Sequence, residues 1–140
     1  MTQQDPPHLH HVVFAVAAER QSVMMDLFTE LGFELQTAEL ADIGVTVALD
    51  WKRGIELMSP IPGSTGTVAS SVNKFLDQHG DGVYTVVMKV ADAAAAETIT
   101  DNYGSIPRFR QGFAGEGSYL DEIDLSVLGI PLTLLATNVP

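Results

Sequence analysis

Polar and apolar positions follow the same order in the two halves of this chain. Residues 9–16 (LHHVVFAV) and 81–90 (DGVYTVVMKV) are short runs rich in apolar and β-branched residues, as expected of strands. Each run is followed by a segment with apolar residues at helical spacing, and then by Gly32 or Gly104 at the expected helix stop. The pattern predicts a strand and then a helix at the start of each half.

The repeat continues beyond the two helices. His11 lies 74 positions before Thr85, and Gly32 lies 72 positions before Gly104, so strand, helix and glycine return together. Three strand-like runs follow each helix, at residues 33–37, 43–50 and 53–58 and again at 106–110, 118–125 and 130–137. Each half is therefore predicted to be a βαβββ module.

We expect one domain, with module one over residues 8–58, a connection over 59–80 and module two over 81–138. The connection begins with a loop rich in Pro, Gly and Ser and continues as a short helix before Gly80. Asp92 is placed to cap the second module's helix. The positions expected on the apolar sides of the two module helices are Val23, Leu27, Phe28 and Leu31, and Ile99 and Tyr103.

Composition narrows the classes of function. The chain has 140 residues, 7 basic against 18 acidic residues, and a net charge of -11. This balance disfavours nucleic acid and anionic membrane surfaces as partners, because both repel acidic chains. The absence of cysteine excludes disulfides and thiolate chemistry. With no signal peptide and no long apolar run, a cytoplasmic location is the expectation.

Five segments in the same order resemble the vicinal oxygen chelate superfamily, which includes glyoxalases, bleomycin resistance proteins and dioxygenases. They are LHHVVFAV, LGFEL, GIELMSP, VNKFLDQHGDGVYTVVMKVAD and GIPLTLLAT. The segment SVNKFLDQHG is most similar to methylmalonyl-CoA epimerase. The resemblance implies an α+β, glyoxalase-like fold in which two βαβββ modules form a curved eight-stranded mixed sheet around a cleft. It also implies a homodimer.

Metal enzymes of this family take one ligand from the first, fourth, fifth and eighth strands. By resemblance these positions fall on His11, Glu56, Thr85 and Thr133. Catalytic metal sites usually keep three protein ligands of the imidazole or carboxylate type, whereas this chain offers two. We therefore expect no metal and no other cofactor.

Without a metal, the predicted cleft has a mostly apolar lining that suits a small organic ligand. Strand alternation places several residues on the same face as the four ligand positions. Those selected as substrate-binding, together with Thr85 and Thr133, are Val13, Met58, Val87, Lys89 and Leu135.

The leading hypothesis is a metal-independent epimerase or isomerase that moves a proton next to a carbonyl in a small acid or thioester. Glu56 is the expected base and His11 its partner, with Thr85, Thr133 and Lys89 as candidate donors to an enolate. One alternative is a ligand-binding protein of the bleomycin-resistance kind, and another is a metal-dependent lyase or dioxygenase. A structural hydrogen bond between His11 and Glu56 is equally open.

The charged residues of the second module fall into two groups, one basic and one acidic. Arg108 and Arg110 either bind a carboxylate or phosphate of a ligand or lie on a solvated strand face. Asp121, Glu122 and Asp124 are interpreted as an exposed strand edge that charge protects from pairing.

Overall fold

The structure is a computed structural model that describes residues 5–139. Its residues group into two compact units, one from His11 to Tyr84 and one formed by the residues up to His10 and from Thr85 onward. The unit boundaries thus fall inside two strands. Within the described residues, no helix is long and apolar enough to cross a membrane.

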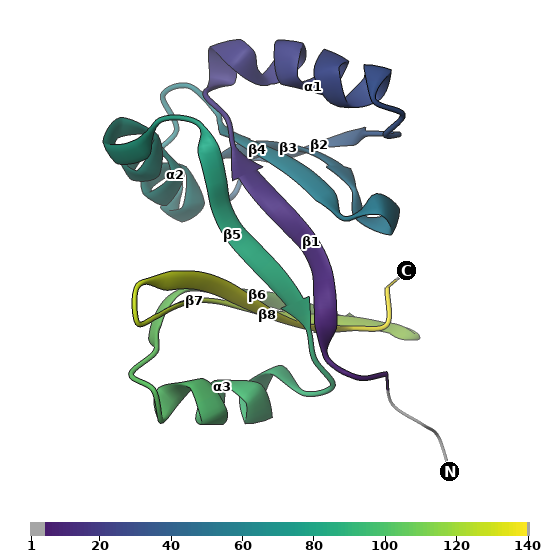
Figure 1. Ribbon diagram of the computed structural model, residues 1–140, viewed down its shortest axis with the longest axis vertical. Coiled ribbons are helices and arrows are strands. Elements are labelled where there is room, and N and C mark those ends of the chain that lie inside the picture. Colours follow the sequence, from purple (N-terminus) through teal and green to yellow (C-terminus); the bar gives the residue numbers. More distant parts are fainter. Residues whose placement is uncertain (1–4, 140) are drawn as a thin grey trace. The chain divides into compact units, whose positions relative to one another are not determined.

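The first unit carries the first βαβββ module and the connecting helix (Figure 1). Its strands follow the order β2-β3-β4-β1, with β1 parallel to β4 and the other pairs antiparallel. The elements are β1 (His8–Ala15), α1 (Gln21–Glu30), β2 (Gln36–Leu40), β3 (Val45–Asp50), β4 (Ile55–Pro60) and α2 (Thr67–His79).

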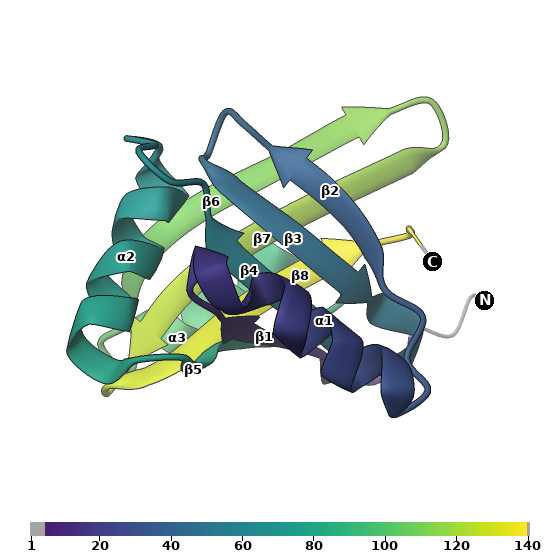
Figure 2. The same cartoon turned by 90° about the horizontal axis from the view of Figure 1, so that it is seen from above.

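The second unit repeats this arrangement. Its strands follow the order β5-β8-β7-β6, with β5 parallel to β8 and the other pairs antiparallel, and β6 and β7 form a long hairpin (Figure 2). The elements are β5 (Gly82–Lys89), α3 (Ala93–Asp101), β6 (Ile106–Gly115), β7 (Ser118–Val127) and β8 (Ile130–Thr137). The predicted α+β class, with two βαβββ modules and eight strands of mixed direction, is confirmed. The single domain and the shared cleft stay predictions.

The second strand of the first module lies later than predicted. Residues 33–37 were expected to form it, but the strand begins at Gln36. Phe33 instead closes the end of α1, where its backbone N–H donates to Phe28 O at 3.0 Å and its ring meets the Phe28 ring edge-on. Glu34 N–H donates to the Asp50 carboxylate at 3.0 Å. Both contacts hold this run as a loop.

The apolar face predicted for α1 is wrong in part. Val23, Leu27 and Leu31 are 63%, 45% and 66% exposed. Of the predicted set, Phe28 packs into the core, next to Met24 and against Leu57 and its neighbours. The i, i+4, i+8 spacing of the three aliphatic residues made a stripe that pattern alone cannot assign to core or solvent.

The apolar side predicted for α3 is wrong as well, although its cap is confirmed. Asp92 accepts a hydrogen bond from Ala95 N at 3.1 Å, as expected of an N-cap. Ile99 and Tyr103, however, are both 62% exposed. The helix packs through its alanines, Ala93 among them, against a cluster on β7 and β8. Small side chains let the helix backbone approach the strands closely.

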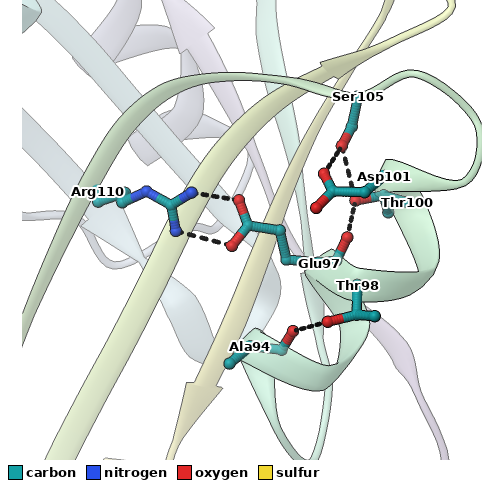
Figure 3. Close-up of polar contacts among 7 residues, drawn as sticks. All are labelled: Ala94, Glu97, Thr98, Thr100, Asp101, Ser105 and Arg110. Atoms are coloured by element: carbon teal, nitrogen blue, oxygen red, sulfur yellow. Dashed lines mark hydrogen bonds and ion pairs between the residues drawn. The ribbon is translucent and has the colours of Figure 1, made fainter.

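A side-chain network fixes α3 to β6 (Figure 3). Arg110 donates to both carboxylate oxygens of Glu97, which raises the pKa of the Arg110 guanidinium. At the end of the helix, Ser105 donates to Asp101 at 2.7 Å and accepts from Thr100 at 3.1 Å. Arg110 is therefore engaged in holding the helix in place.

The hydrogen bonds of Asp50, at the turn between β3 and β4, predict that the protein loses stability in acid. Asp50 accepts from Glu34 N–H, and also from the backbone and side chain of Arg53, so its pKa is lowered. A carboxyl with a lowered folded pKa stabilises the protein above its unfolded pKa of 3.8, and this stability is lost as the pH falls through the folded value. We expect Asp50→Asn to lower the midpoint of urea unfolding at pH 7. The difference between the midpoints at pH 7 and pH 3 should also be smaller in this variant than in the wild-type protein. A difference between the two midpoints as large as that of the wild-type protein would contradict this prediction.

Candidate functional site

The strand register relates the four predicted ligand positions in pairs. In the first unit, Val13 of β1 is the parallel partner of Glu56 on β4. In the second unit, Val87 of β5 is the parallel partner of Thr133 on β8. The first-strand positions, His11 and Thr85, each lie two residues before the paired valine. The repeat inferred from sequence offsets is thus matched by hydrogen-bonding register.

In the first unit, His11 and Glu56 lie together. His11 Nε2 is 3.3 Å from Glu56 Oε1, and the two side chains are 2% and 13% exposed. The indole Nε1–H of Trp51 donates to the same oxygen at 3.1 Å. Trp51 also stacks on the His11 ring, with centroids 5.1 Å apart. One carboxylate oxygen is therefore held from two sides, while the side chain still reaches solvent.

A short turn places Trp51 against this pair. Trp51 to Arg53 form a single 3-10 turn between β3 and β4, in which the Asp50 carboxylate accepts from Arg53 N–H at 3.3 Å. Gly54 ends the turn with φ +82°, a left-handed conformation that favours glycine. The chain then enters β4, which carries Glu56. The turn fixes the distance between indole and carboxylate.

Apolar residues surround Glu56 along the strands. Its register partners are Val13 on β1 and Leu49 on β3, and Met58 follows two residues later on β4. Val13 and Met58 are buried. Val13 and Met58 thus lie beside Glu56 in the first unit, and their role in binding a ligand stays a prediction.

In the second unit, the corresponding positions carry hydroxyl groups. Thr85 Oγ1 and Thr133 Oγ1 are 2.9 Å apart and both side chains are buried. Thr133 donates to Asp124 Oδ1 at 3.4 Å, and Arg108 donates to the same oxygen at 2.7 Å from Nη2. The predicted lining residues Val87 and Leu135 are buried in the same unit. A chain of hydrogen bonds thus leads from a half-buried guanidinium to the threonine pair.

The interpretation of Asp124 as part of an exposed strand edge is wrong. Strand β7 lies between β6 and β8, and Asp124 is buried opposite Thr133. Burial raises the pKa of the Asp124 carboxyl, and the Arg108 ion pair works in the opposite direction. Arg108 therefore neither faces solvent freely nor is available to a ligand without leaving this carboxylate.

The acceptor at Asp124 sets the order of the hydroxyl protons. When Asp124 is ionised, its carboxylate only accepts, so Thr133 donates its proton to Asp124 and the bond between the two threonines is donated by Thr85. This order leaves lone pairs of Thr85 Oγ1 free to accept from a ligand. Donation to a ligand requires one of these bonds to break first.

The donor set does not fit the four-ligand metal site that the fold family implies. Glu56 Oε1 already accepts from Trp51 and faces His11, and the two threonine oxygens are hydrogen-bonded to each other. Within residues 5–139, no three His, Asp or Glu side chains come together. A neutral hydroxyl is also a weak ligand for divalent ions. The expectation of a metal-free protein stays a prediction.

Two features of the site were missed by sequence reasoning. The single Trp51 opens the turn that leads into the strand of Glu56, and its position five residues before Glu56 was the available signal. Asp124 could have been paired with Thr133 by counting outward from the two-residue turn at Leu128 and Gly129, both of which have positive φ.

Comparisons with known proteins identify the fold. No family model matches the sequence, and no curated protein matches it. Among solved structures, a hypothetical protein from Bacillus halodurans superimposes with a TM-score of 0.72 at 19% identity, covering 97% of this chain and 98% of that one. Methylmalonyl-CoA epimerase from Mycobacterium tuberculosis gives a TM-score of 0.64 at 24% identity, covering 94% and 88%. A 4-hydroxymandelate synthase mutant from Streptomyces coelicolor gives 0.65 at 15% identity over 96% of this chain and 50% of that one. The chain has the glyoxalase-like fold of the vicinal oxygen chelate proteins.

Proposed function

We propose that this protein is an enzyme that moves a proton next to a carbonyl group in a small acid or thioester. The observation that carries the proposal is the asymmetric environment of the Glu56 carboxylate. Oε1 is held by the Trp51 indole and faces His11, whereas Oε2 makes no hydrogen bond to the part of the chain that the structure describes. A fixed carboxylate with one open oxygen is suited to act as a general base.

In the proposed reaction, Glu56 Oε2 takes the proton from the carbon beside the carbonyl. The electron pair of the broken C–H bond moves into the carbonyl as an enolate, and a proton from Glu56 then returns to the opposite face of the same carbon, which inverts its configuration. His11 Nε2, 3.3 Å from Oε1, stabilises the carboxylate and exchanges protons with it. The aliphatic neighbours Val13 and Met58 limit water around the reacting carbon. No step of this scheme uses a metal.

A deuterium exchange assay tests the proposal. Small 2-substituted carboxylic acids and acyl thioesters are incubated with the protein in D2O, and the C–H signal beside the carbonyl is followed by proton NMR. We expect protein-dependent loss of this signal for at least one compound class, unchanged by EDTA. Exchange that EDTA abolishes and a divalent metal restores would contradict the metal-free scheme. No exchange in any class would contradict the enzyme.

A ligand-binding protein is the second candidate, and the threonine pair favours it. The positions of the second module that correspond to His11 and Glu56 carry Thr85 and Thr133, which offer neutral hydroxyls and no titratable group. Binding without turnover needs shape and a few hydrogen bonds only. Ligand binding that survives Glu56→Gln, together with no exchange in the NMR assay, identifies this case.

The homodimer belongs to the same proposal and rests on the fold resemblance. Light scattering at micromolar concentration tests it, with a mass near twice 15.0 kDa as the expected result. A monomer mass across the concentration range would contradict it.

A further inference from the structure

A cavity of about 190 Å³ lies in the second unit, and none of its lining residues takes part in the proposed reaction. It is lined by residues at and just before the start of β1, by the end of β5 and the two residues after it, by the start of β7 and by the end of β8. Its polar side chains include Lys89, Tyr119 and His8. The cavity combines a cation, a phenol and an imidazole in one place.

Lys89 is a half-buried cation without a carboxylate partner. Each of the four arginines forms an ion pair with an aspartate or glutamate, and the other two lysines, Lys52 and Lys74, are exposed. Among residues 5–139, no carboxylate lies within ion-pair distance of the Lys89 ammonium. Burial of a charge is unfavourable unless the charge is paired. An external anion would supply the missing partner.

The wall beside Lys89 is held in place by hydrogen bonds. The backbone N–H of Tyr119 donates to Asn138 Oδ1 at 2.9 Å, and Tyr119 O accepts from the Thr137 hydroxyl at 2.7 Å. Thr137 Oγ1 in turn accepts from Val139 N at 3.0 Å. At the other wall, His8 Nδ1 donates to Pro6 O at 2.8 Å. A cavity fixed before binding loses less entropy when a ligand enters.

The volume of the cavity and the charged residues that line it narrow the class of ligand that it can bind. A volume of 190 Å³ corresponds to about six water molecules and lies below the roughly 300 Å³ at which drug-sized sites begin. Asp5 also lines the cavity, so a dianion would meet one cation and one carboxylate there. A single negative charge fits better. Pro6, Val90 and Ala91 offer apolar surface for a short hydrocarbon part.

We propose that this cavity binds a small aliphatic monocarboxylate, whose carboxylate pairs with the Lys89 ammonium and accepts a hydrogen bond from the Tyr119 phenol. The site is independent of Glu56, and it stands whether or not the proposed proton transfer occurs. Its chemistry is that of an accessory site for a small carboxylic acid.

Titration of the 15N-labelled full chain with sodium propionate at constant ionic strength tests the proposal. We expect saturable shifts of the amides of Val90, Ala91 and Tyr119. Lys89→Gln should weaken binding at least tenfold, because a hydrogen bond to a charged group contributes about 1.5–3 kcal/mol. Lys74→Gln makes the same charge change at an exposed lysine and should leave the affinity unchanged.

Two further binding measurements, one with Lys89→Arg and one with inorganic phosphate, test the proposal even if Lys89→Gln does not fold. Lys89→Arg retains the positive charge and should bind propionate within a few-fold of wild type, even if Lys89→Gln fails to fold. Inorganic phosphate at the same concentration should bind more weakly than propionate. The proposal is overturned if Lys89→Arg abolishes binding, if Lys89→Gln and Lys74→Gln weaken it equally, if phosphate binds more tightly, or if no amide near the cavity shifts.

Discussion

We expect Glu56→Gln to lower the rate of deuterium exchange at the substrate carbon by about 100- to 10,000-fold, the usual contribution of a general base. The amide keeps the shape of the side chain and can still accept from the Trp51 indole at the position of Oε1. It cannot take up a proton from carbon. The loss should therefore fall on turnover, with ligand affinity changed only a few-fold, and NMR exchange rates at several substrate concentrations separate the two.

The matched control is Glu39→Gln on β2, which removes the same charge at an exposed position. It should exchange at the wild-type rate. Thermal unfolding of both variants checks that the fold is retained. If Glu56→Gln exchanges as fast as wild type once a substrate is known, the site assignment fails and the His11–Glu56 contact is structural.

Trp51→Phe separates orientation from proton transfer within the same site. Phenylalanine keeps an aromatic ring beside His11 but removes the Nε1–H that holds Glu56 Oε1. We expect exchange to slow roughly tenfold, in line with the loss of one hydrogen bond to a charged group. Thr46→Val, on β3, is a suitable comparison because no role in the site is assigned to it. A wild-type rate in Trp51→Phe would show that the indole does not position the base.

The module repeat could be predicted because it rests on features that survive in a single sequence. A strand run, a helix and a glycine stop recur at nearly constant offsets, and Gly32 and Gly104 both take the positive φ that such stops require. The equivalence of Glu56 and Thr133 came from the family resemblance, and the strand register agrees with it, because Glu56 pairs with Val13 and Thr133 pairs with Val87. The order of the elements and the spacing between them can be predicted from the sequence without knowledge of the tertiary packing.

The helix faces and the polar partners could not be predicted, for different physical reasons. In α1, Phe28 and the aliphatic stripe through Leu27 both satisfy helical spacing, and only tertiary packing decides between them. The Trp51 contact depends on a turn whose geometry is set by Gly54. Asp124 looked like a surface charge because carboxylates are rarely buried, and its partner Arg108 lies 16 residues away on another strand.

We expect Asp124→Ala to lower the free energy of unfolding by about 2–3 kcal/mol at pH 7, and Asp124→Asn by less. Removing the carboxylate takes away the acceptor that Arg108 and the Thr133 hydroxyl share. The loss of one partner from a fully buried pair costs roughly 3–5 kcal/mol, and Arg108, 28% exposed, recovers part of this by hydration. Asp121→Ala, exposed on the same strand, should stay within about 0.5 kcal/mol of wild type. Urea unfolding measures all three.

The raised pKa of Asp124 gives this prediction a pH dependence that a simple loss of packing would not have. Between the ordinary value of 3.8 and the raised folded value, the folded protein holds a proton that the unfolded chain releases. The contribution of Asp124 to stability therefore falls as the pH rises through this interval. Asp124→Asn has no such proton, so the stability advantage of wild type over Asp124→Asn should shrink between pH 4 and pH 7. An advantage that grows with pH would mean that the Arg108 ion pair outweighs desolvation in the folded protein.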